Sequence, residues 1–306
     1  MTRRCLWGTV GAVVLLVLSG CRSASVSTTR TVPLAAKPVT KDATREELLE
    51  SYNSMAGNIR SINSTVELKP TAGSKYSGLI EEYHEVKAFL FAERPAEIRV
   101  IGQAPVIGTT IFDMASDGQT FRVSIPSKGK FLTGPVSLER PSEKPIENLR
   151  PQHLLEALLW PEIRKEEATL FEEFNDETSR YYVLTVLRGG YRTEILRKVW
   201  FDRSDLRETR LQRFGPNGAL VSDVRLSDWR PVDAPAAANG PSDQPAPPAT
   251  FPRTIRIDRP HDDYRLDLQL LKVTLNEKIP VQRFELEQPA GSELVQVSEA
   301  AEKKQP

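Results

Sequence analysis

The sequence predicts an α+β protein that is mainly antiparallel β. Apolar and polar residues alternate along many short stretches, which is the period of half-buried strands. Turns of only a few residues separate these stretches, and such turns are too short for the crossovers that parallel strands need. Two further segments have the spacing of helices with one apolar face, so we expect at least two helices against the sheet.

The N-terminus has the pattern of a bacterial lipoprotein signal. Two arginines precede an apolar stretch, Val10 to Leu18, which is short for a membrane span. Residues 18–21 then read L-S-G-C, a lipobox. We therefore expect residues 1–20 to be a removed signal peptide and Cys21 to be lipidated. A plain secretory signal and a short membrane anchor are the alternatives.

Lipidation of the cysteine and the residue that follows it indicate how the protein is anchored and in which membrane. The resemblance to bacterial lipoproteins implies several acyl chains on Cys21, palmitate among them, and hence a stable membrane anchor, because one chain anchors only reversibly. Asp at the next position marks inner-membrane retention in diderm bacteria, whereas this chain has Arg22. We expect the outer membrane, on the side facing the periplasm. Residues 21–43, rich in Ser, Thr, Ala and Pro, predict a flexible tether.

Composition excludes several classes of protein. The chain has 41 basic and 41 acidic residues, so it lacks the basic excess of nucleic-acid binders and polybasic membrane modules. Cys5 lies in the signal and Cys21 is the lipidation site. No thiol then remains for a disulfide, a zinc site or a cysteine nucleophile.

The first helix of the folded domain is predicted to begin at Thr44. Thr44 and Glu47 have the spacing of a capping box, which satisfies free backbone N–H groups at a helix start. Apolar residues follow at spacings of four and three, which predicts one apolar face packed on the core. These residues are Leu48, Tyr52, Met55, Ile59 and Ile62.

Five strands are predicted between this helix and position 125. Asp117-Gly118 between alternating runs predicts a hairpin. Further turns are expected at Pro70–Ser74 and Lys128–Lys130, and Ile98 and Val100 should share one side of their strand. The five strands are Val66–Lys69, Ser77–Phe91, Ala96–Gly102, Gly108–Met114 and Phe121–Ile125, and Phe131 and Leu132 follow the last turn.

A second, shorter helix precedes seven more strands. Pro151 suits a first helical turn and Pro161 ends the helix, whose apolar face is Leu154, Leu155, Leu158 and Leu159. A slip in the alternation at Leu270-Leu271 predicts a β-bulge. The later strands are Ala168–Phe174, Arg180–Leu187, Thr193–Phe201, Leu206–Phe214, Ala219–Trp229, Thr254–Asp258 and Tyr264–Leu275.

The strands and helices predict one domain over residues 44–288. Residues 233–252 are rich in proline and lack periodicity, so we expect a disordered insertion between two strands. A domain boundary there is the alternative, but the remaining chain is too short to fold alone. Residues 289–306 are polar and predict a loose C-terminal tail.

Side chains that could perform catalysis or bind a metal are sparse. His84, His153 and His261 have no partner at a metal-ligand spacing, so we expect no metal and no cofactor. Adjacent carboxylates such as Glu166-Glu167 point to opposite faces of a strand. No serine nucleophile motif is present. We therefore expect that the protein is not an enzyme.

The segment between two strands at residues 103–110 is unusually apolar for a loop. Val106 and Ile107 stand between Pro105 and Gly108, where polar residues are usual. Two interpretations stay open. Ile107 folds inward and caps the core, or Val106 and Ile107 form an exposed apolar finger that contacts lipid or a lipidated client.

The order of these elements, with the P-V-I-G-T-T segment at 105–110, resembles the LolA/LolB family of lipoprotein carriers and outer-membrane lipoprotein receptors. The resemblance covers most of residues 44–288. It implies an incomplete, half-open β-barrel with two or more helices as a lid over an apolar cavity for acyl chains. In the receptor branch an apolar residue protrudes from a similar loop and helps insert clients, a role that Ile107 would take here. The greater length and the proline-rich insertion depart from that family.

The family resemblance also suggests which residues line the cavity. Aromatic and aliphatic residues expected to point inward either line a hollow or pack into a solid core. They are Phe89, Phe91, Phe112, Phe121 and Val123. The implied function is acyl-chain binding in lipoprotein localisation or envelope lipid handling. The alternative is a non-catalytic structural or sensory envelope lipoprotein that binds a protein partner.

Overall fold

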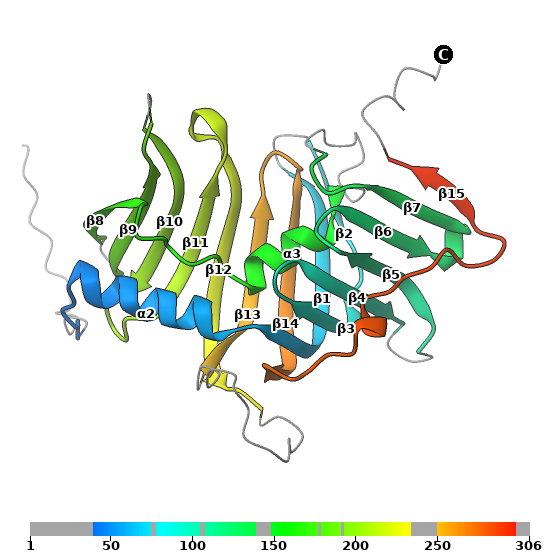
Figure 1. Cartoon of the computed structure of the whole chain (residues 1–306), viewed down its shortest axis with the longest axis horizontal. Helices are drawn as coiled ribbons and strands as arrows, with labels where there is room; N and C mark the ends of the chain where they lie inside the picture. The colour runs from blue at the N-terminus through cyan, green and yellow to red at the C-terminus, as the bar shows by residue number, and fades with distance from the viewer. Residues whose placement is uncertain are drawn as a thin grey trace, which may run out of the picture. The chain divides into compact units, whose positions relative to one another are not determined.

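The described part of the chain is a fifteen-stranded sheet with helices against one face (Figure 1). The computed structural model describes residues 39–74, 78–104, 108–138, 148–176, 179–190, 193–233 and 250–297. These residues belong to one compact unit, Val39–Pro306, which is distinct from Met1–Pro38. No helix within the described ranges is long and apolar enough to cross a bilayer.

The helices described are α2 (Arg45–Asn58), α3 (Pro151–Leu158) and the short 3-10 helices η1 (Pro126–Lys128), η3 (Pro216–Gly218) and η4 (Val281–Arg283). The strands before α3 are β1 (Ser61–Ser74), β2 (Leu79–Glu82), β3 (Val86–Glu93), β4 (Glu97–Gln103), β5 (Thr110–Ser116), β6 (Thr120–Ile125) and β7 (Lys130–Pro135). The later strands are β8 (Ala168–Asn175), β9 (Arg180–Arg188), β10 (Glu194–Asp202), β11 (Glu208–Phe214), β12 (Leu220–Pro231), β13 (Thr250–Arg259), β14 (Tyr264–Leu275) and β15 (Glu293–Gln296).

Two antiparallel meanders form the sheet. One runs from β1 and β3 to β7, the other from β8 to β14, and β1 pairs with β14 where they meet. The edges are β8 and β15, so the sheet does not close into a full barrel. In Figure 1, α2 and α3 lie on the same face of the sheet. The predicted class, mainly antiparallel β in a half-open barrel with helices as a lid, is confirmed.

Helix α2 begins with the predicted capping box. The Glu47 backbone N–H donates to Thr44 Oγ1 at 3.2 Å, and the Thr44 N–H donates to Glu47 Oε2 at 2.8 Å. The predicted apolar face extends too far, because the helix ends at Asn58. Ile59 is its C-cap and Ile62 lies in β1, although both are buried. The buried helical residues are Leu48, Tyr52 and Ala56.

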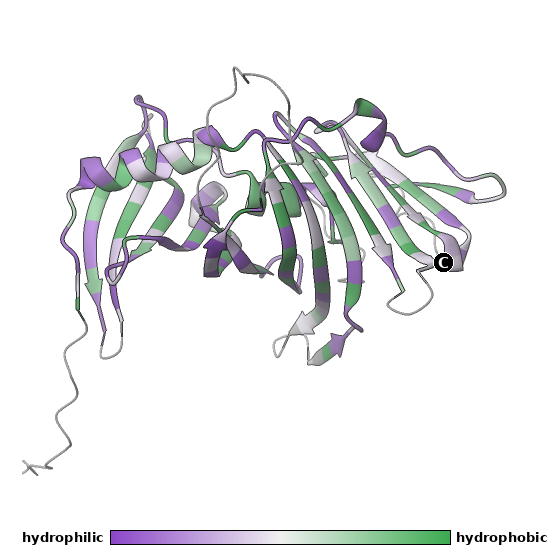
Figure 2. Ribbon diagram, turned by 90° about the horizontal axis from the view of Figure 1, so that it is seen from below, coloured by the Kyte–Doolittle hydropathy of each residue, from purple (hydrophilic) through white to green (hydrophobic). Residues whose placement is uncertain are grey.

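Helix α3 fills the inner side of the sheet as predicted. It starts at Pro151, and Leu154 and Leu158 have no exposed surface. Fully burying one leucine contributes about 1.5–3 kcal/mol, so these residues fix the helix on the sheet. Figure 2 shows that apolar residues alternate with polar ones along the strands, as a sheet covered on one face requires.

Some local features of the strands match the sequence predictions, and others do not. Pro70–Ser74, predicted as a turn, belongs to β1, and the single strand predicted for Ser77–Phe91 is two strands, β2 and β3. The hairpin at Asp117 is confirmed, since its Oδ1 accepts the Thr120 N–H at 2.7 Å. The bulge is also confirmed: Thr65 pairs with Lys272 and Val66 with Leu270, so Leu271 is the extra residue.

The tail predicted to be loose is held over residues 289–297. Strand β15 pairs with β7 in parallel, the Glu293 N–H donates to the Gly129 carbonyl at 2.7 Å, and the Val297 N–H donates to the Thr133 carbonyl at 2.8 Å. Short turns cannot produce this parallel pair, but the long return of the chain does. Residues 234–249 of the predicted insertion lie outside the described residues, between the paired strands β12 and β13.

Candidate functional site

A cavity of about 460 Å³ opens between β10–β12 and the chain that follows α3. Its volume falls in the range of about 300–1,000 Å³ typical of small-molecule sites. Ring and aliphatic side chains from α2, from the end of α3 and from three strands form its apolar wall. They are Tyr52, Trp160, Ile195, Leu196, Val199, Leu211, Phe214 and Val224.

Local strand geometry positions this wall. Val199, Leu211 and Val224 face the helices because alternate residues of a strand point to one side. The pairing of β10 with β9 shifts between Ile195 and Arg197, which marks a bulge. A bulge interrupts the alternation, and residues 195–197 all line the cavity. Strand β10 therefore contributes more consecutive residues to the cavity lining than a regular strand would.

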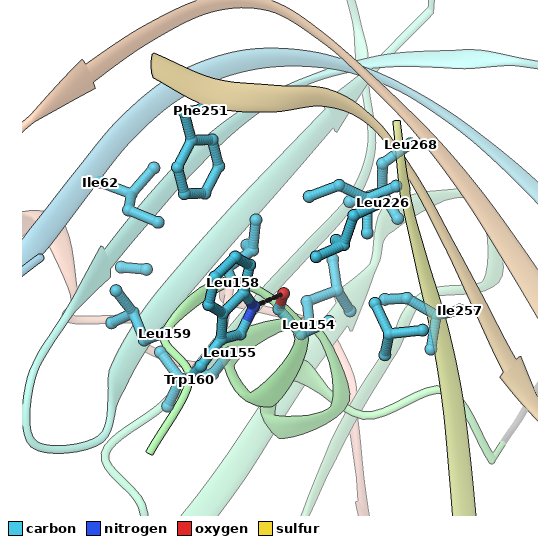
Figure 3. Close-up of a cluster of buried hydrophobic side chains, with 14 of the residues drawn as sticks. Ile62, Leu154, Leu155, Leu158, Leu159, Trp160, Leu226, Phe251, Ile257 and Leu268 are labelled. Carbon is cyan, nitrogen blue, oxygen red and sulfur yellow. Dashed lines mark hydrogen bonds between the residues drawn. The ribbon is translucent and has the colours of Figure 1, made fainter. Parts of the chain in front are cut away.

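Trp160 forms the rigid end of the cavity. Its indole Nε1–H donates to the Ala157 carbonyl at 2.8 Å, as the dashed line in Figure 3 marks. The ring stacks on Tyr52 with centroids 6.2 Å apart and on Phe251 at 6.5 Å, and it meets Trp229 edge-on at 6.4 Å. The leucines of α3 pack beside it (Figure 3). The space beneath α3 is therefore filled, and the hollow lies next to it.

Charged residues line the same cavity. Arg197 Nη2 lies 2.6 Å from Glu167 Oε2, and Arg213 forms an ion pair with Glu156. One Glu156 oxygen and the Arg197 Nε have no hydrogen-bond partner among the described residues. The lining therefore combines an apolar wall with hydrogen-bonding groups, which suits a ligand that has an apolar body and a polar end.

Directional polar contacts tie the helices to the sheet beside the cavity. Arg94, at the β3–β4 turn, donates from Nε to the Ile59 carbonyl at 2.9 Å. Its Nη2 donates to the Ala56 carbonyl at 2.9 Å and to the Trp160 carbonyl at 2.6 Å. Burial lowers the Arg94 pKa. We call this residue the Arg94 clasp, because it joins the ends of both helical segments.

Two further contacts reinforce the clasp. Tyr52 Oη donates to the Pro161 carbonyl at 2.9 Å. Asn53 donates to the Ile163 carbonyl at 2.9 Å and accepts the Ile163 N–H at 2.8 Å. Single hydrogen bonds contribute about 0.5–3 kcal/mol each, and these bonds add to the burial of Leu48, Tyr52 and Ala56 in holding α2 over the chain that follows α3.

A buried polar cluster beneath α3 is structural in character. His153 Nδ1 lies 2.5 Å from Tyr264 Oη. Burial, together with nearby arginines such as Arg259, lowers the His153 pKa well below its ordinary value, and burial raises the Tyr264 pKa. Both groups are therefore neutral at physiological pH. In the described ranges, no three or more His, Cys, Asp or Glu side chains are arranged to hold a metal ion.

The structure places the sequence-predicted lining residues away from this cavity. The inward direction predicted for Phe89 and Phe91 is wrong: Ala88 and Leu90 face the core, and Phe89 is 37% exposed on the other face. The alternation contained a signal for this direction, because Lys87 and Glu93 share the face of Phe89 and Phe91, whereas the other alternate set of β3 is wholly apolar. Phe112, Phe121 and Val123 do point to the inner side, where Phe121 is buried and the other two pack on the core.

The remaining predicted site residues fall outside the described residues. These are Cys21, Val106 and Ile107. Next to the last two, the Ala104 N–H donates to the Thr109 carbonyl at 2.9 Å, which joins the ends of β4 and β5. Sequence reasoning missed the actual wall. The alternation in residues 193–224 was a signal for its strands, but no sequence feature distinguished residues lining a hollow from residues packed in a core.

Comparison with known proteins finds similarity in structure alone. No family model and no curated protein sequence matches the chain. A LolA superfamily protein from Nitrosomonas europaea is 13% identical with a TM-score of 0.44, over 80% of this chain and 99% of that one. A DUF1329 family protein from Desulfovibrio piger is 13% identical with a TM-score of 0.47, over 78% and 94%.

A third similar structure is a domain from Vibrio parahaemolyticus, provisionally assigned to outer membrane lipoprotein sorting. It is 11% identical with a TM-score of 0.44, over 78% of this chain and 94% of that one. The first of these three structures is described as a LolA superfamily protein, the family that the sequence resemblance indicated.

Proposed function

We propose that this protein is a membrane-anchored bacterial lipoprotein that binds acyl chains of lipids or lipoproteins in the cavity beside Trp160. Its role would lie in lipoprotein localisation or envelope lipid handling, and it would perform no covalent chemistry. One observation carries the proposal: a cavity of about 460 Å³ with an apolar wall and charged residues, between strands β10–β12 and the chain that follows α3.

Acyl binding follows from apolar burial. Each methylene moved from water to the apolar wall contributes about 0.8 kcal/mol, so a short length of chain gives useful affinity. The polar end of the ligand would stay near the charged side chains of Glu156 and Arg197, which line the cavity. No bond in the ligand needs to change.

Access to the cavity would depend on the Arg94 clasp. The bonds of Arg94 to the Ile59, Ala56 and Trp160 carbonyls hold α2 and the chain after α3 together. Release of this side chain would let the helices move apart and admit a chain wider than the resting opening. The sheet beneath, held by its full ladder of hydrogen bonds, would stay fixed.

The parts of the proposal that concern anchoring, location and client contact rest on the sequence. Lipidation of Cys21 would place the cavity near a membrane, at the outer membrane facing the periplasm. Val106 and Ile107 would contact the client or the lipid surface. A protein-binding envelope lipoprotein is the second candidate, favoured by the edge strand β8, on which Leu170 is 53% exposed and Phe171 39% exposed.

A fluorescent fatty-acid titration tests the proposed site. Leu211→Gln puts an amide on the cavity wall and should weaken binding about tenfold, because an acyl chain cannot satisfy a buried polar group. Leu170→Gln, on the exposed edge strand, is the matched control and should bind as the unaltered chain does. Equal affinity in all three proteins, with unfolding curves showing that each is folded, would reject the cavity as the binding site.

A further inference from the structure

Three arginines stand side by side on the outer face of the sheet, away from the helices. The register pairs Arg210 of β11 with Arg225 of β12, and Arg225 with Arg256 of β13. Their sequence neighbours Val224 and Ile257 are buried on the inner face. Like charges directly opposite one another destabilise a sheet, so this row needs counter-charges.

Aspartates supply most of the counter-charges. Arg210 Nε lies 2.7 Å from Asp223 Oδ1, and Arg256 Nε lies 2.6 Å from Asp267 Oδ1. The third aspartate, Asp258, accepts from Arg265 Nε at 2.5 Å. Each flanking arginine of the row is thus oriented and partly neutralised by its own partner.

Arg225 is the exception. It is exposed, and among the described residues it has neither an ion pair nor a hydrogen bond from its side chain. Asp223, Asp267 and Asp258 each engage a different arginine, and a fourth aspartate, Asp176, also lines the groove. Arg225 is therefore the arginine of the row that has no acidic partner of its own among the described residues.

The row lines a groove of about 590 Å³. Its other end is aromatic: Phe174 and Tyr181 meet Trp200 edge-on, with ring centroids 5.4 and 5.7 Å apart. Phe174 is 47% exposed. Besides the arginines, Asp267 and these rings, the lining includes Thr209, Ser227, Thr254, Leu226 and Asp176.

We propose that this groove is a docking surface for anionic phospholipid, with Arg225 binding the phosphate and Phe174 entering the apolar side of the interface. A guanidinium matches phosphate oxygens in geometry and charge. Tyr and Trp side chains, present here as Tyr181 and Trp200, are enriched where a bilayer changes from polar to apolar, and a free phosphate ion would not need them for binding. The surface lies on the opposite face of the sheet from the acyl cavity and does not depend on it.

Co-sedimentation with vesicles tests the proposal. The chain beginning at Arg22 keeps the whole compact unit and lacks Cys21, so any binding comes from the folded protein. We expect it to bind phosphatidylglycerol–phosphatidylethanolamine vesicles and to release them at high salt. Arg225→Gln should weaken binding about fivefold, the effect of one arginine near an anionic surface. Phe174→Ser should weaken it as well.

Two control variants show whether a loss of vesicle binding comes from Arg225 itself. Arg265→Gln removes a charge from the same face, but one that Asp258 already engages, and should bind as the unaltered chain does. Leu211→Gln, altered in the cavity, should also bind normally, which separates this proposal from the acyl site. Absence of vesicle binding, equal binding by Arg225→Gln, or an equal loss in Arg265→Gln would overturn the proposal. So would full competition by millimolar inorganic phosphate, which would indicate a site for small anions.

Discussion

At the scale of single residues, the buried charges set how this protein responds to pH. Glu208 is 4% exposed on the inner face, and one of its carboxylate oxygens has no partner among the described residues. Burial raises its pKa to about 7. Its pKa in the unfolded chain is lower, so the folded state holds the proton more tightly. The associated stability is full in acid and is lost as pH rises through about 7.

Glu208→Gln should remove this pH dependence. The neutral amide has nearly the same shape and cannot ionise, so the variant should exceed the unaltered chain in stability by about 2 kcal/mol at about pH 8. The gap should close towards about pH 5. Urea unfolding at both pH values measures it. A variant that is less stable at the higher pH would show that the ionised carboxylate is stabilising.

The Arg94 clasp makes the second prediction at this scale. Arg94→Met keeps the apolar stem but removes three charged hydrogen bonds to backbone carbonyls, which should cost about 2–4 kcal/mol of stability. If the clasp limits access, stopped-flow uptake of a fluorescent fatty acid should become faster. Arg60→Met, at a neighbouring exposed position, is the control. Unchanged uptake in Arg94→Met would mean that the cavity opens elsewhere.

The sequence pattern predicted contacts between residues close in sequence better than it predicted which face of the sheet a side chain takes. The capping box of Thr44 and Glu47 needs only four consecutive residues, so the sequence contains it completely. The direction predicted for Phe89 was wrong, although its alternate set also contains the charged Lys87 and Glu93. The wholly apolar set that includes Ala88 and Leu90 faces the core instead.

At the scale of elements, the C-terminal segment protects an edge of the sheet. Arg99 Nη1 donates to the Glu285 carbonyl at 2.7 Å, and β15 then pairs with β7. Without β15, the N–H and C=O groups on the open side of β7 would be free to pair with another chain. The segment predicted to be loose therefore has a structural role.

A chain that ends at Gln288 tests this role. It lacks β15 and should unfold at a lower temperature and self-associate, because the edge of β7 is open. A chain that ends at Val297 keeps β15 and is the matched control. Size-exclusion chromatography and thermal unfolding distinguish the two. A stable monomer ending at Gln288 would show that the pairing contributes little.

Element boundaries were predictable where a local signal marks them. Helix α3 lies between two prolines, and the slip at Leu270-Leu271 revealed the bulge in β14. The pairing of β15 with β7 joins segments more than 150 residues apart, which no local pattern records. Pro70 was predicted to lie in a turn, but the chain continues through it as part of β1. It lies near the end of β1 that pairs with the short strand β2.

At the scale of the whole molecule, lipidation would determine where the cavity acts. Cys21→Ser should abolish incorporation of labelled palmitate and release the protein from membranes, while the folded unit Val39–Pro306 stays intact. Fractionation of the labelled cells measures both effects. Label retained in the variant would contradict the lipobox at residues 18–21.

The sequence could not predict which residues line the cavity. Its wall joins Tyr52 of α2, Trp160 after α3, and strands β10–β12, and the hollow exists only once these segments meet. The resemblance suggested a cavity in the fold but located it among residues 89–123. The structure fills that side with α3 and leaves the hollow in the other meander.

Native mass spectrometry of the chain beginning at Arg22, purified from bacterial cells without detergent, would detect a bound acyl chain directly. We expect a bound lipid or lipopeptide mass, and less of it in Leu211→Gln. After the lipid is stripped from the unaltered chain, added fatty acid should restore a bound mass. A clean mass of the protein alone, unchanged after lipid is added, would contradict acyl binding and favour the protein-binding alternative.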